Sequence, residues 1–195
     1  MRFFKFFLFF MIVTSSAVAQ YRTPIKRANL RAGVNYIFQN GSNYNDIAAT
    51  GKENIQGNGF IGYRFDPENE RANYFGLFGS MSGIQSASIT QMVNDSAIVA
   101  PPNYTNGKGS LTDVEVGFIF REWFRISVGP GKMKLPVTGG WSNLKYYNAT
   151  AGLVFRIGAV NLNFNTSTQF GGDIKKPTFR VAAGAALSFN FINAR

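Results

Sequence analysis

The chain has 195 residues, with 20 Lys and Arg against 10 Asp and Glu, and it contains neither cysteine nor histidine. Without cysteine the chain has no disulfide scaffold, zinc ribbon, iron–sulfur cluster or thiol nucleophile. Without histidine it lacks the usual general base at neutral pH. Phe, Tyr and Gly are abundant at 20, 8 and 21 residues, whereas charged residues make up only 15%.

The first nineteen residues have the pattern of a secretory signal peptide. Arg2 and Lys5 form a basic start, residues 6–13 form an apolar centre, and Ala17-Val18-Ala19 is a small-x-small cleavage site. The apolar centre is much shorter than the about 20 residues of a spanning helix. We therefore expect cleavage after Ala19. Loss of the two basic residues lowers the formal charge from +10 to +8.

From residue 29 onward, apolar and polar side chains alternate with a period of two, which predicts strands. The first three predicted strands span residues 29–39, 56–65 and 74–82. In the first of them, Leu30, Val34 and Phe38 share one face, and Arg31 and Asn35 lie on the other. This alternation is typical of a sheet with one apolar and one polar face.

The second half of the chain alternates more clearly. Five further strands are predicted, over residues 111–121, 124–128, 144–157, 160–170 and 178–191. In the first of these, Asp113 and Glu115 share one face and Val114 and Val116 the other. Most of the eight strands are about 9 to 14 residues long, which exceeds the usual soluble strand and suits a tilted span of a bilayer.

The connections between the predicted strands alternate between long and short. Residues 39–56, 83–110 and 129–143 form long connections, whereas residues 66–73, 122–123 and 158–159 form short ones. Long loops on one side and tight turns on the other are the layout of an outer-membrane barrel. In hydrocarbon a closed barrel is also the one sheet that pairs every backbone polar group.

We therefore predict an all-β fold, namely an eight-stranded antiparallel up-and-down transmembrane β-barrel with long outer loops and short periplasmic turns. The barrel is expected over residues 29–191, after a short periplasmic tail at residues 20–28 and before a C-terminal extension at residues 192–195. Aromatic residues at strand ends are expected to form interfacial girdles: Tyr36, Phe38, Tyr63, Phe65, Trp123, Phe124, Phe189 and Phe191. The alternative is a soluble lipocalin-like barrel, whose strands are usually shorter and whose loops need not alternate in length.

The signal peptide, the eight alternating strands and the rhythm of the connections resemble the small eight-stranded OmpA/OmpX-like outer-membrane barrels. In the last strand, Gly184, Leu187, Phe189 and Phe191 resemble the C-terminal signal that the barrel-assembly machinery reads, although the chain continues to Arg195. The high content of Asn, Phe and Gly resembles that of small barrels of the Bacteroidota. The resemblance implies an integral protein of the bacterial outer membrane with both termini in the periplasm.

Side chains fill the interior of an eight-stranded barrel, so we expect the charged residues of the polar faces to form an ionic network in the lumen. The expected members are Arg31, Arg64, Asp113, Glu115, Arg125, Arg156 and Arg180. The preferred interpretation is a plug of ion pairs. The alternative is that the four arginines predicted near the periplasmic end bind an anionic head group or an acidic segment of a partner. Neither interpretation gives an open pore.

The sequence predicts no catalytic, cofactor-binding or metal-binding residue, and hence no enzyme and no cofactor. Asp113 and Glu115 lie two residues apart on one face with arginine nearby, which is more typical of an ion-pair network than of an active site. Residues 57–62 match the spacing of a dinucleotide-binding loop, but they lie inside a predicted strand that no helix follows, so we reject a nucleotide site.

Outer-membrane lipid and lipopolysaccharide are the expected partners, together with other outer-membrane proteins. Four lysines predicted in loops are expected to contact lipopolysaccharide phosphates: Lys132, Lys134, Lys175 and Lys176. Ser96 follows Asp95 in a short pattern that resembles the Bacteroidota signal for O-glycosylation. The basic residues are scattered, so nucleic-acid binding is not expected.

Two functions from different classes remain open from the sequence. The preferred one is a non-enzymatic structural or accessory subunit of a larger outer-membrane complex, such as a translocon, a transporter or an assembly machine. The alternative is a free-standing surface barrel whose long outer loops bind a host, phage or matrix ligand. A narrow channel is a third and weaker interpretation.

Overall fold

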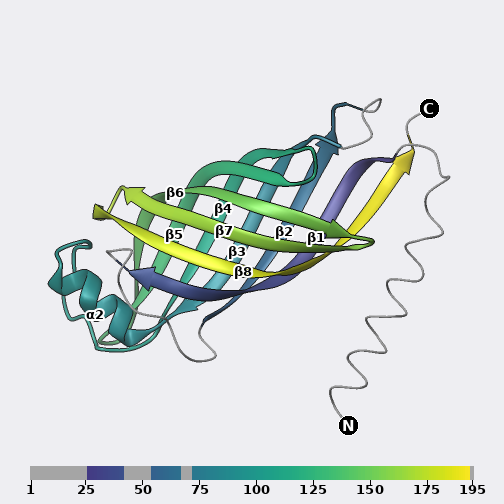
Figure 1. Cartoon of the computed structure of the whole chain (residues 1–195). Coiled ribbons are helices and arrows are strands. Elements are labelled where there is room, and N and C mark those ends of the chain that lie inside the picture. The colour runs from purple at the N-terminus through teal and green to yellow at the C-terminus, as the bar shows by residue number, and fades with distance from the viewer. Residues whose placement is uncertain (1–25, 42–53, 67–71, 194–195) are drawn as a thin grey trace, which may run out of the picture.

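The computed structural model describes residues 26–41, 54–66 and 72–193. The predicted signal peptide, the first part of the predicted periplasmic tail and the centre of the first predicted loop lie outside these residues. So do residues 194–195 of the predicted extension. The described residues form eight strands and one helix, α2, which lies at one end of the molecule (Figure 1).

The eight strands form one closed antiparallel sheet. Their bounds are β1 Lys26–Gly41, β2 Ile55–Arg64, β3 Tyr74–Ile84, β4 Gly109–Phe120, β5 Phe124–Val137, β6 Gly140–Ile157, β7 Val160–Gly171 and β8 Ile174–Asn193. Each strand pairs with the next along the chain, and β8 pairs with β1. The predicted eight-stranded up-and-down antiparallel barrel is therefore confirmed, with strands that begin before and end after the predicted limits of 29 and 191.

The strands are tilted relative to the axis of the barrel. Cα partners followed around the sheet from Ala28 of β1 do not return to Ala28 but reach β1 again at Gln39. Such a stagger is what allows a sheet to close, and closure leaves no strand edge unpaired. β1 begins and β8 ends at the end opposite α2 (Figure 1). We call the two ends the helix end and the termini end.

The barrel turns its apolar face outward. Large hydrophobic side chains on the outer face, such as Leu30, Val34, Ile61 and Met81, are between 38% and 63% exposed. The inward face of the same strands buries polar residues, among them Asn29 and Asn35. A soluble barrel keeps its apolar face inside, so the lipocalin-like alternative is not the arrangement found.

The prediction of a long connection over residues 129–143 is wrong. β5 continues to Val137 and β6 begins at Gly140, so Thr138 and Gly139 alone form the turn, with Gly139 at a φ of +87°. Pro130 lies where the β4–β5 ladder is interrupted, and Pro136 lies beyond its last pair, so neither proline removes a bond from that ladder. Glycine and proline here are strand residues, although their composition indicated a loop.

The long connection over residues 83–110 is confirmed, but much of it is ordered structure. It contains α2, Ser86–Asn94, whose Ile89 and Met92 are fully buried. The chain then crosses the end of the barrel, where Lys175 N–H donates to Ala97 C=O at 2.7 Å and Thr105 N–H donates to Pro136 C=O at 3.1 Å. A nine-residue helix is too short for its period to stand out in the sequence.

Two apolar clusters lie inside the barrel. The larger one lies at the helix end, where Ile89 and Met92 of α2 pack onto residues of the barrel and the following loop: Ile84, Ala97, Ile98, Leu111, Met133, Leu135, Leu144, Tyr146 and Ile174. The smaller one lies at the termini end: Phe60, Ala72, Tyr74, Phe78 and Ile119. Among the residues that the structure describes, no helix is long and apolar enough to cross a membrane.

Candidate functional site: the polar lumen

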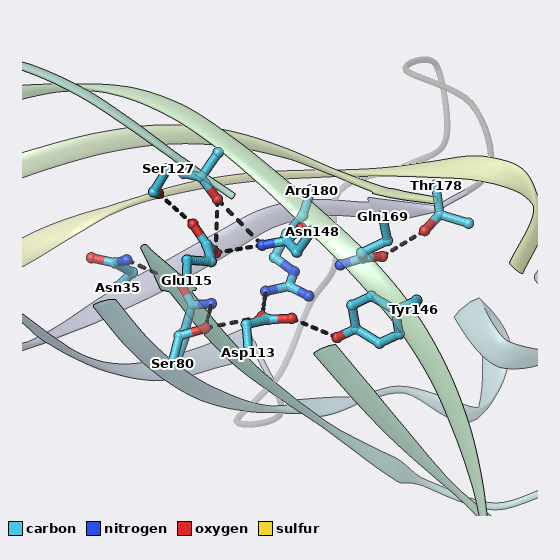
Figure 2. A network of polar contacts seen from close by, with 12 residues as sticks. Asn35, Ser80, Asp113, Glu115, Ser127, Tyr146, Asn148, Gln169, Thr178 and Arg180 are labelled. Atoms are coloured by element: carbon cyan, nitrogen blue, oxygen red, sulfur yellow. Dashed lines mark hydrogen bonds and ion pairs between the residues drawn. The ribbon is translucent and has the colours of Figure 1, made fainter. Parts of the chain in front are cut away.

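Asp113 of β4 is the centre of the polar network nearest the helix end. Its Oδ1 accepts from Tyr146 Oη at 2.7 Å, and its Oδ2 accepts from Ser80 Oγ at 3.0 Å and from Arg180 Nη1 at 3.1 Å. Asp113 and Arg180 are 1% and 2% exposed, so this ion pair is shielded from water. Figure 2 shows Ser80 of β3, Tyr146 of β6 and Arg180 of β8 converging on Asp113.

The Asp113 network continues around the wall through neutral side chains. Ser80 Oγ accepts from Gln56 Nε2 at 3.0 Å, and Gln56 Oε1 accepts from Asn35 Nδ2 at 3.1 Å. These bonds link β1, β2, β3 and β4 across the inward face of the sheet. Within this network, the enclosed groups that form these bonds meet a protein partner in place of water.

Glu115, two residues further along β4, is the centre of a second network. Its Oε1 accepts from Asn148 Nδ2 at 2.6 Å and from Thr150 Oγ1 at 3.0 Å. Its Oε2 accepts from Arg125 Nη2 at 3.0 Å and from the hydroxyl of Ser127. Four donors therefore occupy one carboxylate, and the Arg125 guanidinium also lies 3.9 Å from the centre of the Phe78 ring.

Two further ion pairs lie toward the termini end. Arg156 Nη1 is 2.7 Å from Glu122 Oε1, with the arginine side chain one third exposed. Arg64 Nε is 3.8 Å from Asp66 Oδ1. These pairs are only partly shielded, so removal of one partner should destabilise the protein less than in the buried pairs.

Arg31 is the one member of the expected ionic network that has no carboxylate partner among the described residues. Its Nε donates to Asn29 Oδ1 at 2.7 Å. Its guanidinium carbon lies 5.6 Å from the Phe60 ring centre and 5.4 Å from that of Tyr74. Arg31 is nevertheless only 5% exposed.

The structure thus brings six of the seven expected residues into ion pairs and leaves Arg31 apart. The sequence analysis missed the neutral residues that complete the two networks: Asn35, Gln56, Ser80, Ser127, Tyr146, Asn148 and Thr150. The available signal was their position on the predicted polar faces. Which carboxylate each would meet depends on the register between strands, which period-two alternation does not encode.

The chemistry of this site is that of a filled interior. Asp113 accepts three hydrogen bonds and Glu115 accepts four, so both carboxylates are engaged mainly by the surrounding side chains. No group of metal-ligating side chains occurs in the part of the chain that the structure describes. The enclosed space beside Arg31 and Arg125 is a cavity of about 20 Å³, which is far too small for an organic substrate.

Lys132, Lys134, Lys175 and Lys176 do not lie in loops, contrary to the expectation. The first two belong to β5 and the last two to β8. All four are exposed, and Lys176 Nζ donates to Asp95 C=O at 2.6 Å. The reason is the same extension of strands beyond their predicted ends that removes the loop at 129–143. Their contact with lipopolysaccharide stays a prediction.

Lys145 is a residue that the sequence analysis missed. It lies on β6 directly opposite Lys132 on β5, and both side chains are exposed. Like charges that face each other across a ladder repel.

Ser96, the predicted glycosylation site, is exposed just after α2 and has a φ of +54°. Its modification stays a prediction.

A shallow hollow lies on the outside of the helix end, between α2 and the following loop. Six of the seven residues that line it carry a hydroxyl, amide or carboxylate group: Ser86, Ala87, Thr90, Gln91, Asn94, Asp95 and Asn106. Asn106 Oδ1 accepts from Ser86 Oγ at 2.9 Å and from Thr90 Oγ1 at 3.1 Å, which fixes the loop against the helix.

No protein-family model matches the chain, and no curated protein matches it. Among solved structures, the chain is similar to Ail, the attachment invasion locus protein of Yersinia pestis, at 15% identity over 84% of this chain and 99% of that chain, with a TM-score of 0.44. It is also similar to Neisserial surface protein A, at 11% identity over 83% and 97%, with a TM-score of 0.45. At these identities the likeness concerns the fold alone.

Proposed function

We propose that the protein is an integral barrel of the bacterial outer membrane that is closed to solutes, is not an enzyme, and presents its helix end at the cell surface for binding. The observation that carries this proposal is the inverted arrangement of the barrel. Its outer face is apolar around the whole circumference, and its interior is filled by hydrogen-bonded charges.

The outer face has the chemistry that a bilayer requires. Exposed Tyr63, Phe65 and Trp123 lie toward the termini end, whereas Tyr36 and Tyr147 lie toward the helix end. Aromatic residues at two levels, with aliphatic residues between them, are the girdles of an outer-membrane barrel. In water, exposed apolar area of this extent promotes association, which supports lipid as the surrounding solvent.

The helix end is the better candidate for a binding surface. It carries the ordered connection between β3 and β4, the projecting β5–β6 hairpin and the polar hollow beside α2. Its hydroxyl and amide groups suit a hydroxyl-rich ligand such as a glycan, because neutral donors and acceptors pair with hydroxyls without a charge to desolvate. At the termini end, the fully described connections are only residues 121–123 and 158–159, so they present a smaller surface.

Single-cysteine labelling tests the orientation, because the natural chain has no cysteine. An Ala87→Cys variant places the thiol on the exposed face of α2, and an Arg121→Cys variant places it in the β4–β5 turn. With a membrane-impermeant maleimide, intact cells should label the first variant and not the second. Permeabilised cells should label both. Labelling of the second variant alone on intact cells would overturn the proposal.

Binding itself is tested by the adhesion of cells that express the protein to an array of glycans and matrix proteins. The Gln91→Ala, Asn94→Ala double variant should lose adhesion to any spot that the wild type binds, because both side chains line the hollow. Asn143→Ala, an exposed change on β6 at the same end, should retain it. Equal adhesion by the first variant would remove the hollow from the proposal.

A second candidate function, an accessory subunit of a larger outer-membrane complex, is favoured by a groove on the outer face. The small residues Ala149, Ala151, Thr166 and Thr168 line it together with the larger Phe75, Phe118 and Ile126. Such a depression suits close contact with another membrane protein. Ala149→Trp should then dissociate a stoichiometric complex in native mass spectrometry of mild detergent extracts. A wild-type protein that migrates alone would count against the subunit role.

A further inference from the structure

The charges that face the lumen do not balance. Apart from Arg27 at the start of β1, whose Nη1 donates to Tyr63 Oη at 2.8 Å, five described arginines that face the lumen stand against four carboxylates. Each carboxylate forms an ion pair with a different arginine: Arg64 with Asp66, Arg125 with Glu115, Arg156 with Glu122, and Arg180 with Asp113. Arg31 is the fifth arginine. Among the described residues, Arg31 is therefore an inward-facing charge without a carboxylate partner.

Arg31 also lacks a full set of hydrogen bonds. Its Nη1 is buried and has no hydrogen-bond partner, although Nε donates to Asn29. The rings of Phe60 and Tyr74 lie beside the guanidinium and attract it weakly. A buried guanidinium with an unpaired N–H group is unfavourable unless a negative charge lies nearby.

A small cavity lies beside Arg31 inside the barrel. Arg31, Asn58 and Arg125 line this cavity, whose volume is about 20 Å³. Asn58 Nδ2 is a second buried donor without an acceptor. Asn165 also lines the cavity, and rotation of its amide can present either its oxygen or its nitrogen. The volume holds about one water molecule or one small ion and excludes a carboxylate or a phosphate.

We infer that this cavity is a binding site for one small monovalent anion, chloride under cellular conditions, held by Arg31 Nη1 and Asn58 Nδ2 in the field of Arg125. The anion supplies the fifth negative charge and completes the ionic network of the lumen. The inference depends on the closed lumen and its charges, and it is independent of which surface ligand the helix end binds.

Bromide replaces chloride in the first test, because its anomalous scattering identifies it in a crystal. Crystals of the refolded wild-type barrel grown in sodium bromide should show one anomalous peak within hydrogen-bond distance of Arg31 Nη1. An Arg31→Gln variant should lose that peak. A wild-type cavity that contains a water molecule and no anomalous signal would overturn the inference.

Thermal unfolding in detergent provides a second test in solution. At equal ionic strength, the wild-type midpoint should be higher in sodium chloride or bromide than in sodium gluconate, whose anion is too large for the cavity. The difference should be roughly 5 °C at about one hundred times the dissociation constant. Arg156→Gln removes a charge from the partly exposed rim and should keep this difference, whereas Arg31→Gln should lose it. Equal midpoints for the wild type in all three salts would contradict the proposal.

Discussion

Asp113 shows at the scale of a single residue what stabilises the interior of the barrel. Its carboxylate is fully buried and is held by one charged and two neutral donors. Removal of one member of a buried ion pair leaves the other charge without compensation, which typically costs about 3–5 kcal/mol. A pair on a protein surface contributes only about 0.2–1 kcal/mol. The burial of an ion pair in the lumen, more than its N···O distance, therefore decides how much stability is lost when one partner is removed.

We expect Asp113→Ala to lower the free energy of unfolding by about 3–5 kcal/mol, and Glu122→Gln, at the rim, by at most about 1 kcal/mol. Urea unfolding in lipid vesicles, followed by the fluorescence of Trp123 and Trp141, measures both. The double change Asp113→Leu, Arg180→Met should recover much of the loss because it leaves no unpaired charge. Equal effects of the two single changes would show that burial does not govern the network.

The facing lysines at the helix end give a second prediction at this scale. Lys132 and Lys145 repel each other unless an anion lies between them. If lipid A phosphates fill that role, the double change Lys132→Ala, Lys145→Ala should weaken lipopolysaccharide binding about tenfold or more, since each lysine near an anionic surface contributes about 1 kcal/mol. A lipopolysaccharide co-sedimentation assay measures the affinity. Arg27→Ala, Arg121→Ala removes two charges near the termini end and should leave it unchanged.

At the scale of the element, a row of three glycines on neighbouring strands leaves room for adjacent atoms where a Cβ atom would clash. Gly62, Gly76 and Gly117 are in register on β2, β3 and β4. A Cβ atom on Gly62 would lie 2.1 Å from the Phe60 ring, and one on Gly76 would lie 2.2 Å from Ile61 C=O. The backbone obstructs the second of these positions and cannot move aside as a side chain could.

Gly76→Ala should therefore destabilise the folded barrel by several kcal/mol or prevent its folding. Gly79, three residues further along β3, has nothing within 4 Å of its Cβ position, so Gly79→Ala should be neutral or slightly stabilising. The heat-dependent shift in electrophoretic mobility and the yield of refolding into vesicles compare the two variants. If both alanine variants fold equally well, the close packing at Gly76 is not as described.

At the scale of the whole molecule, three successive layers close the barrel. The apolar cluster beneath α2 lies at the helix end, the Asp113 and Glu115 networks lie in the middle, and the cluster around Phe60 lies at the termini end. α2 is therefore only one of several closures. Because the polar layer consists of strand residues, it does not depend on the connection above it.

Planar bilayers should consequently show no stable conductance with the wild-type protein. Replacement of residues 86–97 by a Gly-Ser linker should expose the apolar cluster to water but still give no channel, since the Asp113 and Glu115 networks remain. Current should flow only when Asp113→Ala, Glu115→Ala and Phe60→Ala are introduced together into that variant, because the cluster around Phe60 closes the termini end. Steady conductance of the wild type would contradict a closed lumen.

The sequence by itself determined the number of strands and the direction in which each face points, because period-two alternation is a local property of the chain. Leu30 and Arg31 lie on opposite faces wherever their strand is placed. It also indicated that charges such as Asp113 and Arg180 must meet partners inside. It misjudged residues 129–143, where glycine and proline have the composition of a turn but lie in paired strands.

Only the tertiary structure decided which charges meet. The register between strands and the tilt that closes the sheet bring Arg180 of β8 to Asp113 of β4, far apart in the chain, while Arg31 receives no carboxylate among the described residues. The tertiary structure also decided that α2 packs over the end of the barrel. Ile89 and Met92 of this helix are buried because the barrel supplies an apolar cluster for them to contact. The local alternation of residues decides which face of the sheet each side chain occupies, and closure of the barrel decides which side chains meet in the lumen.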